Sequence, residues 1–256
     1  MATFLKSLSL TSRRISAASV RNHSSLTNQL IENMDKKATW DRFYAESSNR
    51  ITFKNFEWFF GFRTIRDFIM PLLQSSPHPD ALLRVVDMGC GISALGPCIY
   101  RHSPLPALVT CADISPVAVR LMQEHIQAEA VEPRSLSSRI EFVELDCTQL
   151  QKYFGSGSVD LIVDKGTTDA LLRSKEGKGK ACLVLKQCLE VLRSSGSLLQ
   201  FSDEDPDARL LWLEAEARNQ GVMANVGVRD VGQLGGMCYY CYHITPRPVL
   251  SGHLEC

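Results

Sequence analysis

The chain has 256 residues, enough for one large domain, and its 45% hydrophobic and 22% charged side chains are typical of a globular protein with a buried core. The first 31 residues hold four basic side chains and no acid; removing these four from the 28 basic residues leaves 24 against 28 acidic ones, a net charge of −4. Nucleic-acid binders need clustered basic residues, and a membrane-spanning helix needs about 20 mostly apolar residues. We therefore expect neither a nucleic-acid partner nor membrane insertion.

The chain has nine cysteines, and most of them lie within apolar segments. An odd number of scattered thiols is typical of a reducing compartment and not of a disulfide framework. Cys238 and Cys241 stand close together, but no second cysteine or histidine pair follows at zinc-ligand spacing. We therefore expect no metal site.

Residues 1–30 are rich in serine, contain arginine and lack acids, and Leu5, Leu8, Ile15 and Val20 can form one face of a basic helix. This composition predicts a mitochondrial transit peptide that is removed from the mature chain, and hence a location in the mitochondrial matrix. The alternative is an N-terminal tail without a targeting role.

Residues 31–80 are expected to form an N-terminal helical cap, with helices at 33–47 and 63–73. Trp40 and Tyr44 lie four residues apart in the first helix and therefore share a face. Such a pair usually serves packing. A helix that precedes a sheet can also cover an adenosine pocket, so both interpretations stay open.

From residue 81 to residue 246, strands alternate with helices, which predicts a doubly wound, Rossmann-like α/β fold with helices on both faces of a mostly parallel sheet. The expected strands are 83–87, 108–113, 140–145, 159–164 and 197–201. The expected helices are 93–102, 116–130, 180–192 and 207–219. Two last strands joined through glycines predict an antiparallel hairpin at one edge, 224–231 with 237–245, followed by a tail at 247–256.

The most informative segment is Arg84–Gly91, in which an apolar strand runs into a glycine-rich turn. Glycines at such a turn let the backbone approach a ligand closely. Asp87 stands two residues before the first glycine; its charge is unfavourable beside a pyrophosphate but suits a ligand with an amine or a sulfonium. The turn therefore favours S-adenosylmethionine over a dinucleotide, and we expect Asp87, Gly89 and Gly91 to contact it.

Acids end four consecutive strands, at Asp87, Asp113, Asp146 and Asp164. Open parallel sheets bind their ligands beyond these carboxyl ends. Asp113, 22 residues after Gly91, is expected to accept the ribose hydroxyls. Asp146, together with Cys147, is expected to bind adenine, and Asp164 lies next to the expected reaction centre. A single acid at a strand end often serves only a turn, but four of them with the glycine turn predict a cofactor pocket.

Residues 164–170, Asp-Lys-Gly-Thr-Thr-Asp-Ala, begin where a strand ends and lead into a helix. Gly166 permits a tight turn, and Thr167 or Thr168 can cap the helix. Lys165 can pair with a neighbouring acid. The segment is either a capped loop with a surface lysine or a part of the pocket.

The glycine turn and the strand ends resemble the seven-strand class of S-adenosylmethionine-dependent methyltransferases over residues 83–245. The resemblance implies the strand order 3-2-1-4-5-7-6. The class often has a third glycine where this chain has Ser93.

Four further motifs are similar to those of protein-lysine methyltransferases: Trp40–Tyr44, Phe56–Phe59, Asp164–Ala170 and Phe201–Pro206. Within this group, Phe201–Pro206 together with the transit-like residues 1–30 resembles the mitochondrial citrate synthase lysine methyltransferases. The resemblance implies S-adenosylmethionine as the cofactor, S-adenosylhomocysteine as its product and citrate synthase as the protein substrate. It also implies that the cofactor is contacted by Trp40, Tyr44, Trp58, Gly89, Asp113, Ile114, Asp146, Cys147 and Lys165.

Methyl transfer to lysine requires a neutral amine in line with the methyl carbon and sulfur, although free lysine has a pKa of about 10.4. Burial and the sulfonium charge both lower that pKa, so a strong base is not required. Carboxylates at the mouth can position the ammonium and accept its proton, and the catalytic candidates are Asp164, Asp169 and Asp203. Aromatic side chains that can line the acceptor channel are Phe59, Phe60 and Phe201.

Three alternatives remain at this stage. A small-molecule methyltransferase of the matrix shares every cofactor residue. An NAD-dependent oxidoreductase can use Gly89-x-Gly91-x-x-Ala94 with Asp113, but Asp87 argues against it. A non-catalytic assembly factor on a methyltransferase fold is expected to have a degraded pocket, whereas these pocket residues are intact.

Overall fold

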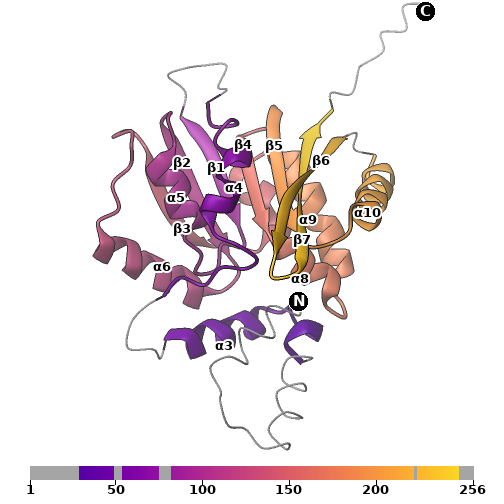
Figure 1. Cartoon of the computed structure of the whole chain (residues 1–256), viewed down its shortest axis with the longest axis horizontal. Helices are drawn as coiled ribbons and strands as arrows, with labels where there is room; N and C mark the ends of the chain where they lie inside the picture. Colours follow the sequence, from indigo (N-terminus) through magenta and orange to yellow (C-terminus); the bar gives the residue numbers. More distant parts are fainter. Residues whose placement is uncertain (1–28, 49–53, 75–81, 222–223, 248–256) are drawn as a thin grey trace, which may run out of the picture.

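The computed structural model describes residues 29–48, 54–74, 82–221 and 224–247 (Figure 1). These residues form one seven-stranded sheet in the order β3-β2-β1-β4-β5-β7-β6, which confirms the predicted fold. The predicted transit peptide and C-terminal tail lie almost entirely outside the described residues. No helix within the described ranges is both long and apolar enough to cross a membrane.

Five parallel strands form the body of the sheet: β1 (Leu83–Met88), β2 (Ala107–Asp113), β3 (Arg139–Glu144), β4 (Val159–Lys165) and β5 (Leu192–Ser202). The last two strands, β6 (Ala224–Leu234) and β7 (Met237–Pro246), pair antiparallel with each other, and β7 pairs antiparallel with β5. The expected hairpin is therefore confirmed. Its turn lies at Gly235-Gly236, while Gly232 sits in a bulge within β6.

The helices are α3 (Lys37–Ser48), α4 (Phe62–Ile69), α5 (Leu95–His102), α6 (Pro116–Glu129), α7 (Leu150–Phe154), α8 (Thr167–Arg173), α9 (Lys178–Val191) and α10 (Pro206–Asn219), with a 3-10 turn at Cys147–Gln149. Ser115 stands directly before Pro116, the first residue of α6, and caps this helix, because its hydroxyl accepts a hydrogen bond from the Ala118 amide. Its hydroxyl also donates to Asp41 of α3, 2.6 Å away, which ties α3 to α6.

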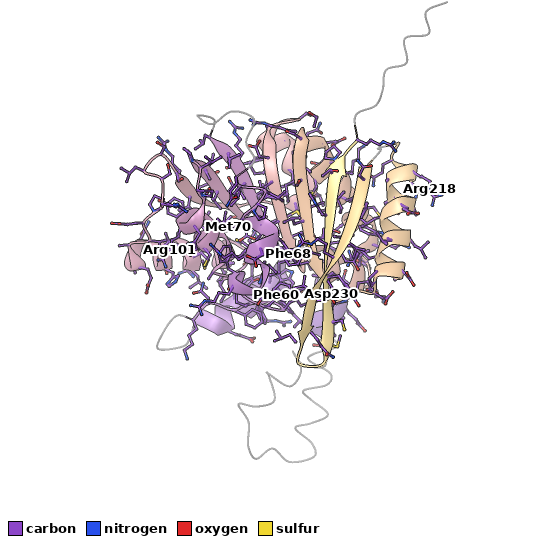
Figure 2. The ribbon with its side chains drawn as sticks, turned by 45° about the horizontal axis from the view of Figure 1, so that its top comes forward. Phe60, Phe68, Met70, Arg101, Arg218 and Asp230 are labelled. Carbon is purple, nitrogen blue, oxygen red and sulfur yellow. The ribbon has the colours of Figure 1, made fainter. Side chains whose placement is uncertain are left out.

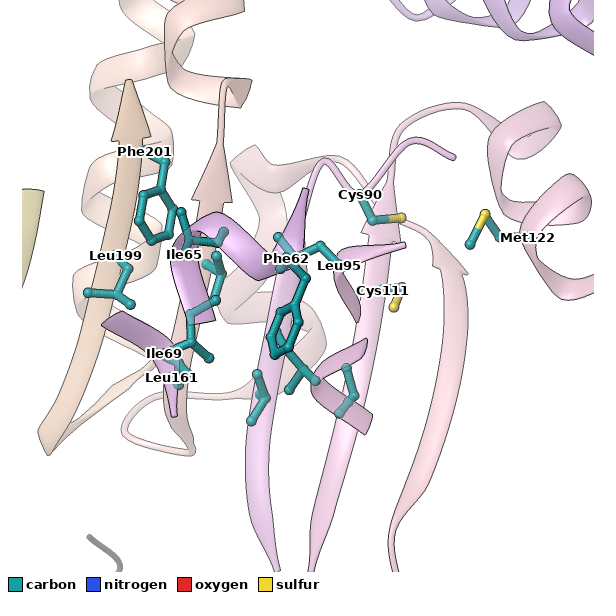
Figure 3. Close-up of a cluster of buried hydrophobic side chains, with 14 of the residues drawn as sticks. Phe62, Ile65, Ile69, Cys90, Leu95, Cys111, Met122, Leu161, Leu199 and Phe201 are labelled. Carbon is teal, nitrogen blue, oxygen red and sulfur yellow. The ribbon is translucent and has the colours of Figure 1, made fainter. Parts of the chain in front are cut away.

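The two faces of the sheet carry separate apolar cores, because successive strand residues point to opposite sides. Val85 belongs to one core and Val86 to the other. On the first face, Ile65 and Ile69 of α4 pack over β4 and β5 (Figure 3). Each isoleucine is completely buried, and such a side chain contributes about 1.5–3 kcal/mol. The second face is covered by α9, which lies behind the sheet in the view of Figure 1, and by α10, which lies beside the β6 edge in that view.

The structure differs from the sequence-based expectation at several element boundaries. The helix expected at 33–47 begins at Lys37, because the chain turns at 33–35 after a helical stretch at 29–32. The helix expected at 63–73 ends at Ile69, since Pro71 has no amide hydrogen to continue it. The 3-10 turn and α7 were not predicted. Strand β5 starts five residues early, because Leu192 already pairs with Val159 before a register shift.

Helix α3 lies across the carboxyl ends of the parallel strands, below the sheet in Figure 1. The expectation that this helix covers the ligand-binding edge of the sheet is therefore met in its position. Between α3, the strand ends and residues 56–59 there is a cleft.

Candidate functional site

The cleft at the carboxyl ends of the strands spans about 890 Å³, including the solvent space at its mouth. Its wall is formed by Met34, Asp35, Trp40, Tyr44, Trp58, Phe59, Gly89, Asp113, Ile114, Asp146, Cys147, Thr148, Lys165, Gly166, Thr167, Asp169, Ala170, Leu171, Arg173, Lys180 and Val184.

Nine of the eleven residues expected to contact a cofactor line this one cleft, although they come from six separate parts of the chain. The two exceptions are Asp87 and Gly91. Gly91 lies directly behind the wall: a side-chain carbon added to it would stand 2.5 Å from the Tyr44 hydroxyl oxygen. The tyrosine thus covers the second glycine of the turn.

Gly89 forms the floor of the cleft and has a left-handed backbone with φ of +65°. A β-carbon on it would lie 2.0 Å from Thr167 Oγ1, which itself donates a 2.9 Å hydrogen bond to the Met88 carbonyl. Glycine is therefore required both by the backbone angle and by the close approach of α8. The turn after β1 and the start of α8 are locked together at this point.

Asp87 does not reach the cleft because its carboxylate is used by the next helix. Its Oδ2 accepts a 2.9 Å hydrogen bond from the Gly96 amide in the first turn of α5. The first amides of a helix lack partners within the helix, so a carboxylate there is stabilising. Burial raises the pKa of Asp87 to about 7, opposed in part by Lys165. Asp87 therefore links β1 to the start of α5.

Asp113 lies at the end of β2 and lines the cleft. Its Oδ2 accepts from the Gly91 amide and its Oδ1 from the Ser115 amide, both at 2.8 Å. The carboxylate therefore fixes the turn after β1 to the start of α6. Burial raises the pKa of Asp113 to about 6, while these two amides lower it. Each oxygen keeps a second acceptor position for a ligand.

Asp146 and Cys147 line the other end of the cleft, after β3. Asp146 is exposed, and its Oδ1 accepts from the amide and the hydroxyl of Thr148 at 2.9 and 2.8 Å. The Cys147 thiol is buried beside it. A ligand that reaches this end meets a carboxylate oxygen held in place by the 3-10 turn.

Aromatic side chains form the outer wall. The rings of Trp40 and Tyr44 are stacked with centroids 6.0 Å apart, and Trp58 meets Trp40 edge-to-face at 5.9 Å. The Trp40 ring nitrogen donates to the Met34 carbonyl at 2.8 Å. These rings pack together and also line the cleft, so the pair serves packing, and its contact with an adenosine remains a prediction.

Lys165 fastens the segment that carries Trp58. Its ammonium donates to Glu57 at 2.7 Å and to the Trp58 carbonyl at 3.0 Å, and its side chain is only 5% exposed. Glu57 also accepts from the Ser93 hydroxyl and the Ala94 amide. The expected ion pair of Lys165 therefore forms with Glu57 and not with the adjacent Asp164.

Of the three carboxylates proposed as catalytic, Asp169 alone lines the cleft. Asp164 turns back to the start of α8, where it accepts from the amides of Thr167 and Thr168 and from the Thr168 hydroxyl. Asp203 is engaged by the Arg173 guanidinium. The start of α8 therefore binds the carboxylate of Asp164, and the Arg173 guanidinium binds that of Asp203.

Asp169 is held through one oxygen. Its Oδ1 accepts from the Ser202 hydroxyl at 2.7 Å and from the Arg209 guanidinium, and Arg173 lies 3.9 Å away. No donor within the described residues bonds to Oδ2, and the side chain as a whole is buried, with 5% of it exposed. Asp169 therefore presents an unengaged carboxylate oxygen within the wall of the cleft.

The aromatic channel expected from sequence is only partly present. Phe60 and Phe201 are 4% and 1% exposed and belong to the core on the α4 face. Phe59 lines the cleft, has the unusual φ of +63°, and packs against Tyr239 with ring centroids 5.2 Å apart. A left-handed backbone at a bulky residue costs free energy, of order 1–3 kcal/mol. The segment that Lys165 fastens thus holds Phe59 in a strained conformation at the wall.

Asp35 and Lys180 were missed by sequence analysis. The Lys180 ammonium donates to the Asp35 carboxylate at 3.0 Å and to its carbonyl at 2.8 Å, linking the segment before α3 to α9. The partners are 145 positions apart, so no local pattern reveals them. Among the described residues, no cluster of three or more His, Cys, Asp or Glu side chains is arranged to hold a metal ion.

Comparison with known proteins places this site in a family. A methyltransferase domain model matches residues 79–227. A mitochondrial citrate synthase-lysine N-methyltransferase of Danio rerio is 58% identical over 227 residues, covering 88% of this chain and 89% of that protein. Its counterpart from Homo sapiens is 38% identical over 213 residues, covering 81% and 85%.

Among solved structures, the fold is similar to that of a magnesium protoporphyrin IX methyltransferase from Synechocystis PCC 6803 with bound SAM. The TM-score is 0.54 at 16% sequence identity, covering 82% of this chain and 95% of that one. This likeness concerns the fold alone. The sequence matches show more: the chain belongs to the methyltransferase family that includes the mitochondrial citrate synthase-lysine N-methyltransferases.

Proposed function

We propose that the chain is an S-adenosylmethionine-dependent protein-lysine N-methyltransferase that acts on citrate synthase. The observation that carries this proposal is a 58% identical relative with that activity in its name, combined with an intact cleft at the expected sheet edge. Over 88% of the chain aligns with that relative, so the match includes α3 and the motifs around the cleft.

The residues of the cleft fit the cofactor in several respects. Gly89 gives the backbone close access, and Asp113 offers carboxylate oxygens suited to ribose hydroxyls. Asp146 suits the adenine amino group, and the Trp40 and Tyr44 rings suit a flat purine or the ligand's apolar carbons. When bound, S-adenosylmethionine supplies an electrophilic methyl group on a positively charged sulfur.

Asp169 is the carboxylate that we assign to the acceptor lysine. Its Oδ2 accepts a hydrogen bond from the lysine nitrogen and takes one proton from it, leaving a neutral amine with a lone pair. A nearby Arg173 lowers the pKa of a lysine amine in the same space, because like charges disfavour the protonated form. Phe59 offers an aromatic face to the alkyl chain or to a methylated ammonium.

The proposal is tested by incubating the purified chain with mitochondrial extract and radiolabelled S-adenosylmethionine. We expect label on one protein band, identified as citrate synthase by mass spectrometry of the excised band. The Asp113→Ala variant serves as the control and should give no labelled band. Label on small molecules alone would favour a small-molecule methyltransferase, and label on no fraction would favour a non-catalytic factor.

We also propose that the protein works in the mitochondrial matrix. The support is the composition of residues 1–30 and the word mitochondrial in the names of the two relatives. Fusion of residues 1–35 to a fluorescent protein should direct it to mitochondria and leave it protected from protease after the outer membrane is opened. A diffuse cytosolic signal would contradict the proposal.

A further inference from the structure

Arg209 is one of the most deeply buried side chains of the protein. It lies in the first turn of α10, behind the wall of the cleft, and is only 1% exposed. Its Nη2 donates to Asp169 Oδ1 and, at 3.1 Å, to the Ser202 hydroxyl. A fully buried guanidinium is costly unless it is paired and hydrogen-bonded, so its placement needs a reason.

Among the described residues, the Arg209 guanidinium has Asp169 and the Ser202 hydroxyl as its hydrogen-bond partners. Its Nε and Nη1 have no hydrogen-bond partner among the residues that the structure describes. The guanidinium carbon stands 5.5 Å from the ring centre of Trp212 and 5.8 Å from that of Tyr242. These rings shield the charge from water without competing for it, since they offer only their faces.

The engagement of Asp169 is one-sided. Arg209, Ser202 and the more distant Arg173 all approach Oδ1, while no donor among the described residues bonds to Oδ2, and the residue lines the cleft. A structural ion pair in a core has no need to leave one oxygen toward a cleft. We therefore interpret the ion pair between Arg209 and Asp169 as one that orients the Asp169 carboxylate for the reaction.

The charges around Asp169 come from several elements. Arg173 lies on the same helix, Arg209 on α10, Asp164 on β4 and Asp203 after β5, and Tyr242 faces the same region from β7. Burial raises the pKa of Asp169, and the two arginines and the Ser202 hydroxyl lower it. Arg209 is the largest of these opposing influences, so its removal raises that pKa further.

We propose that Arg209 is a positioning residue of the methyl-transfer site, which keeps Asp169 ionised and directs its Oδ2 to the acceptor amine. The inference rests on the proposed lysine methyltransferase activity. It goes beyond that activity in assigning a function to a residue that lies outside the cleft and reaches the acceptor only through Asp169.

The test compares Arg209→Met, Arg209→Lys and Asp169→Asn, and the double variants that combine each Arg209 change with Asp169→Asn. Arg218→Met is the matched control, because Arg218 lies on the same helix but points outward from the molecule (Figure 2). For the wild type and each variant, kcat/KM for methylation of the protein substrate is measured from pH 6 to pH 10. S-adenosylhomocysteine affinity is measured by calorimetry as the check on folding and on the cofactor end of the cleft.

We expect Arg209→Met to lower kcat/KM at least tenfold at pH 7.5 with S-adenosylhomocysteine affinity changed by less than about threefold. Because the variant raises the pKa of Asp169, the acid limb of the profile should move to higher pH. Arg209→Lys keeps the charge and should recover part of the activity and most of the pH profile. In the Asp169→Asn background, either Arg209 change should cause little further loss.

Two results would overturn the proposal. One is a loss of equal size in the presence and absence of the Asp169 carboxylate, which would make Arg209 an independent structural residue. The other is wild-type kcat/KM and pH profile in Arg209→Met. If Arg209→Met fails to fold and does not bind S-adenosylhomocysteine, Arg209→Lys takes its place in this test. The loss caused by Arg209→Lys is then compared in the wild-type and Asp169→Asn backgrounds, and equal losses would again overturn the proposal. Absence of turnover in the wild-type protein itself would instead refute the proposed function.

Discussion

Replacement of Gly89 by alanine tests the physical basis of the cleft. Two costs are expected. The first is the left-handed backbone, φ +65°, which is unfavourable for alanine by about 1–2 kcal/mol. The second is the new β-carbon, which would lie 2.0 Å from Thr167 Oγ1 and displace the threonine from its hydrogen bond to the Met88 carbonyl. A lost hydrogen bond and a forced repacking add about 2–4 kcal/mol.

The control is Gly157→Ala. Gly157 has a similar φ of +61°, but no atom lies within 4 Å of its added β-carbon. Urea unfolding should therefore show a loss of about 1–2 kcal/mol for Gly157→Ala and about 3–6 kcal/mol for Gly89→Ala. In a Thr167→Ala background the extra cost of Gly89→Ala should shrink, because the clashing oxygen is gone. Equal losses at the two glycines would refute the reasoning.

Two further predictions concern the charges of the site. Lys165→Met leaves the partly buried Glu57 without its cation, so the free energy of unfolding should fall by about 2–3 kcal/mol in a denaturant titration; Arg120→Ala, which breaks an exposed pair with Glu124, should change it by less than about 0.5 kcal/mol. Burial raises the pKa of Asp113 to about 6, so this carboxylate is protonated below that pH and S-adenosylhomocysteine binding should weaken as pH falls through about 6. The binding isotherms of Asp113→Asn should lack this step, and an unchanged step in that variant would assign it to another group.

The fold was predictable because its signals are local. Apolar runs of strand length followed by an acid marked four of the five parallel strands, and Ser115-Pro116 marked the start of α6. The start of β5 was not predictable, since Ser195-Gly196 looks like a turn and continues as strand only through pairing across a register shift. That pairing depends on β4, far away in the sequence.

The site was predictable at the level of which residues gather, and less so in how they point. Strand ends fix where a backbone lies, so most of the expected residues line the cleft. Asp87 and Asp164 were expected to face a ligand, but the amides at the starts of α5 and α8 bind their carboxylates. Which donor captures an acid depends on the tertiary position of the next helix, which a sequence pattern does not specify.

Long-range ion pairs were the least predictable part. Lys165 with Glu57 and Arg209 with Asp169 join positions 108 and 40 residues apart. Each residue alone is an ordinary charged side chain in the sequence. That these side chains are buried, and which acid each of them pairs with, is decided only by the folded structure.

The central claim is that the cleft under α3 binds S-adenosylmethionine and serves a lysine of another protein. The most direct measurement is the intact mass of purified citrate synthase after incubation with the full chain and S-adenosylmethionine, followed by peptide mapping. We expect the mass to rise by one or more methyl additions on lysine with the wild-type chain and to stay unchanged with Asp113→Ala. An unchanged mass with a wild-type chain that binds S-adenosylhomocysteine would contradict the assignment of citrate synthase as the substrate.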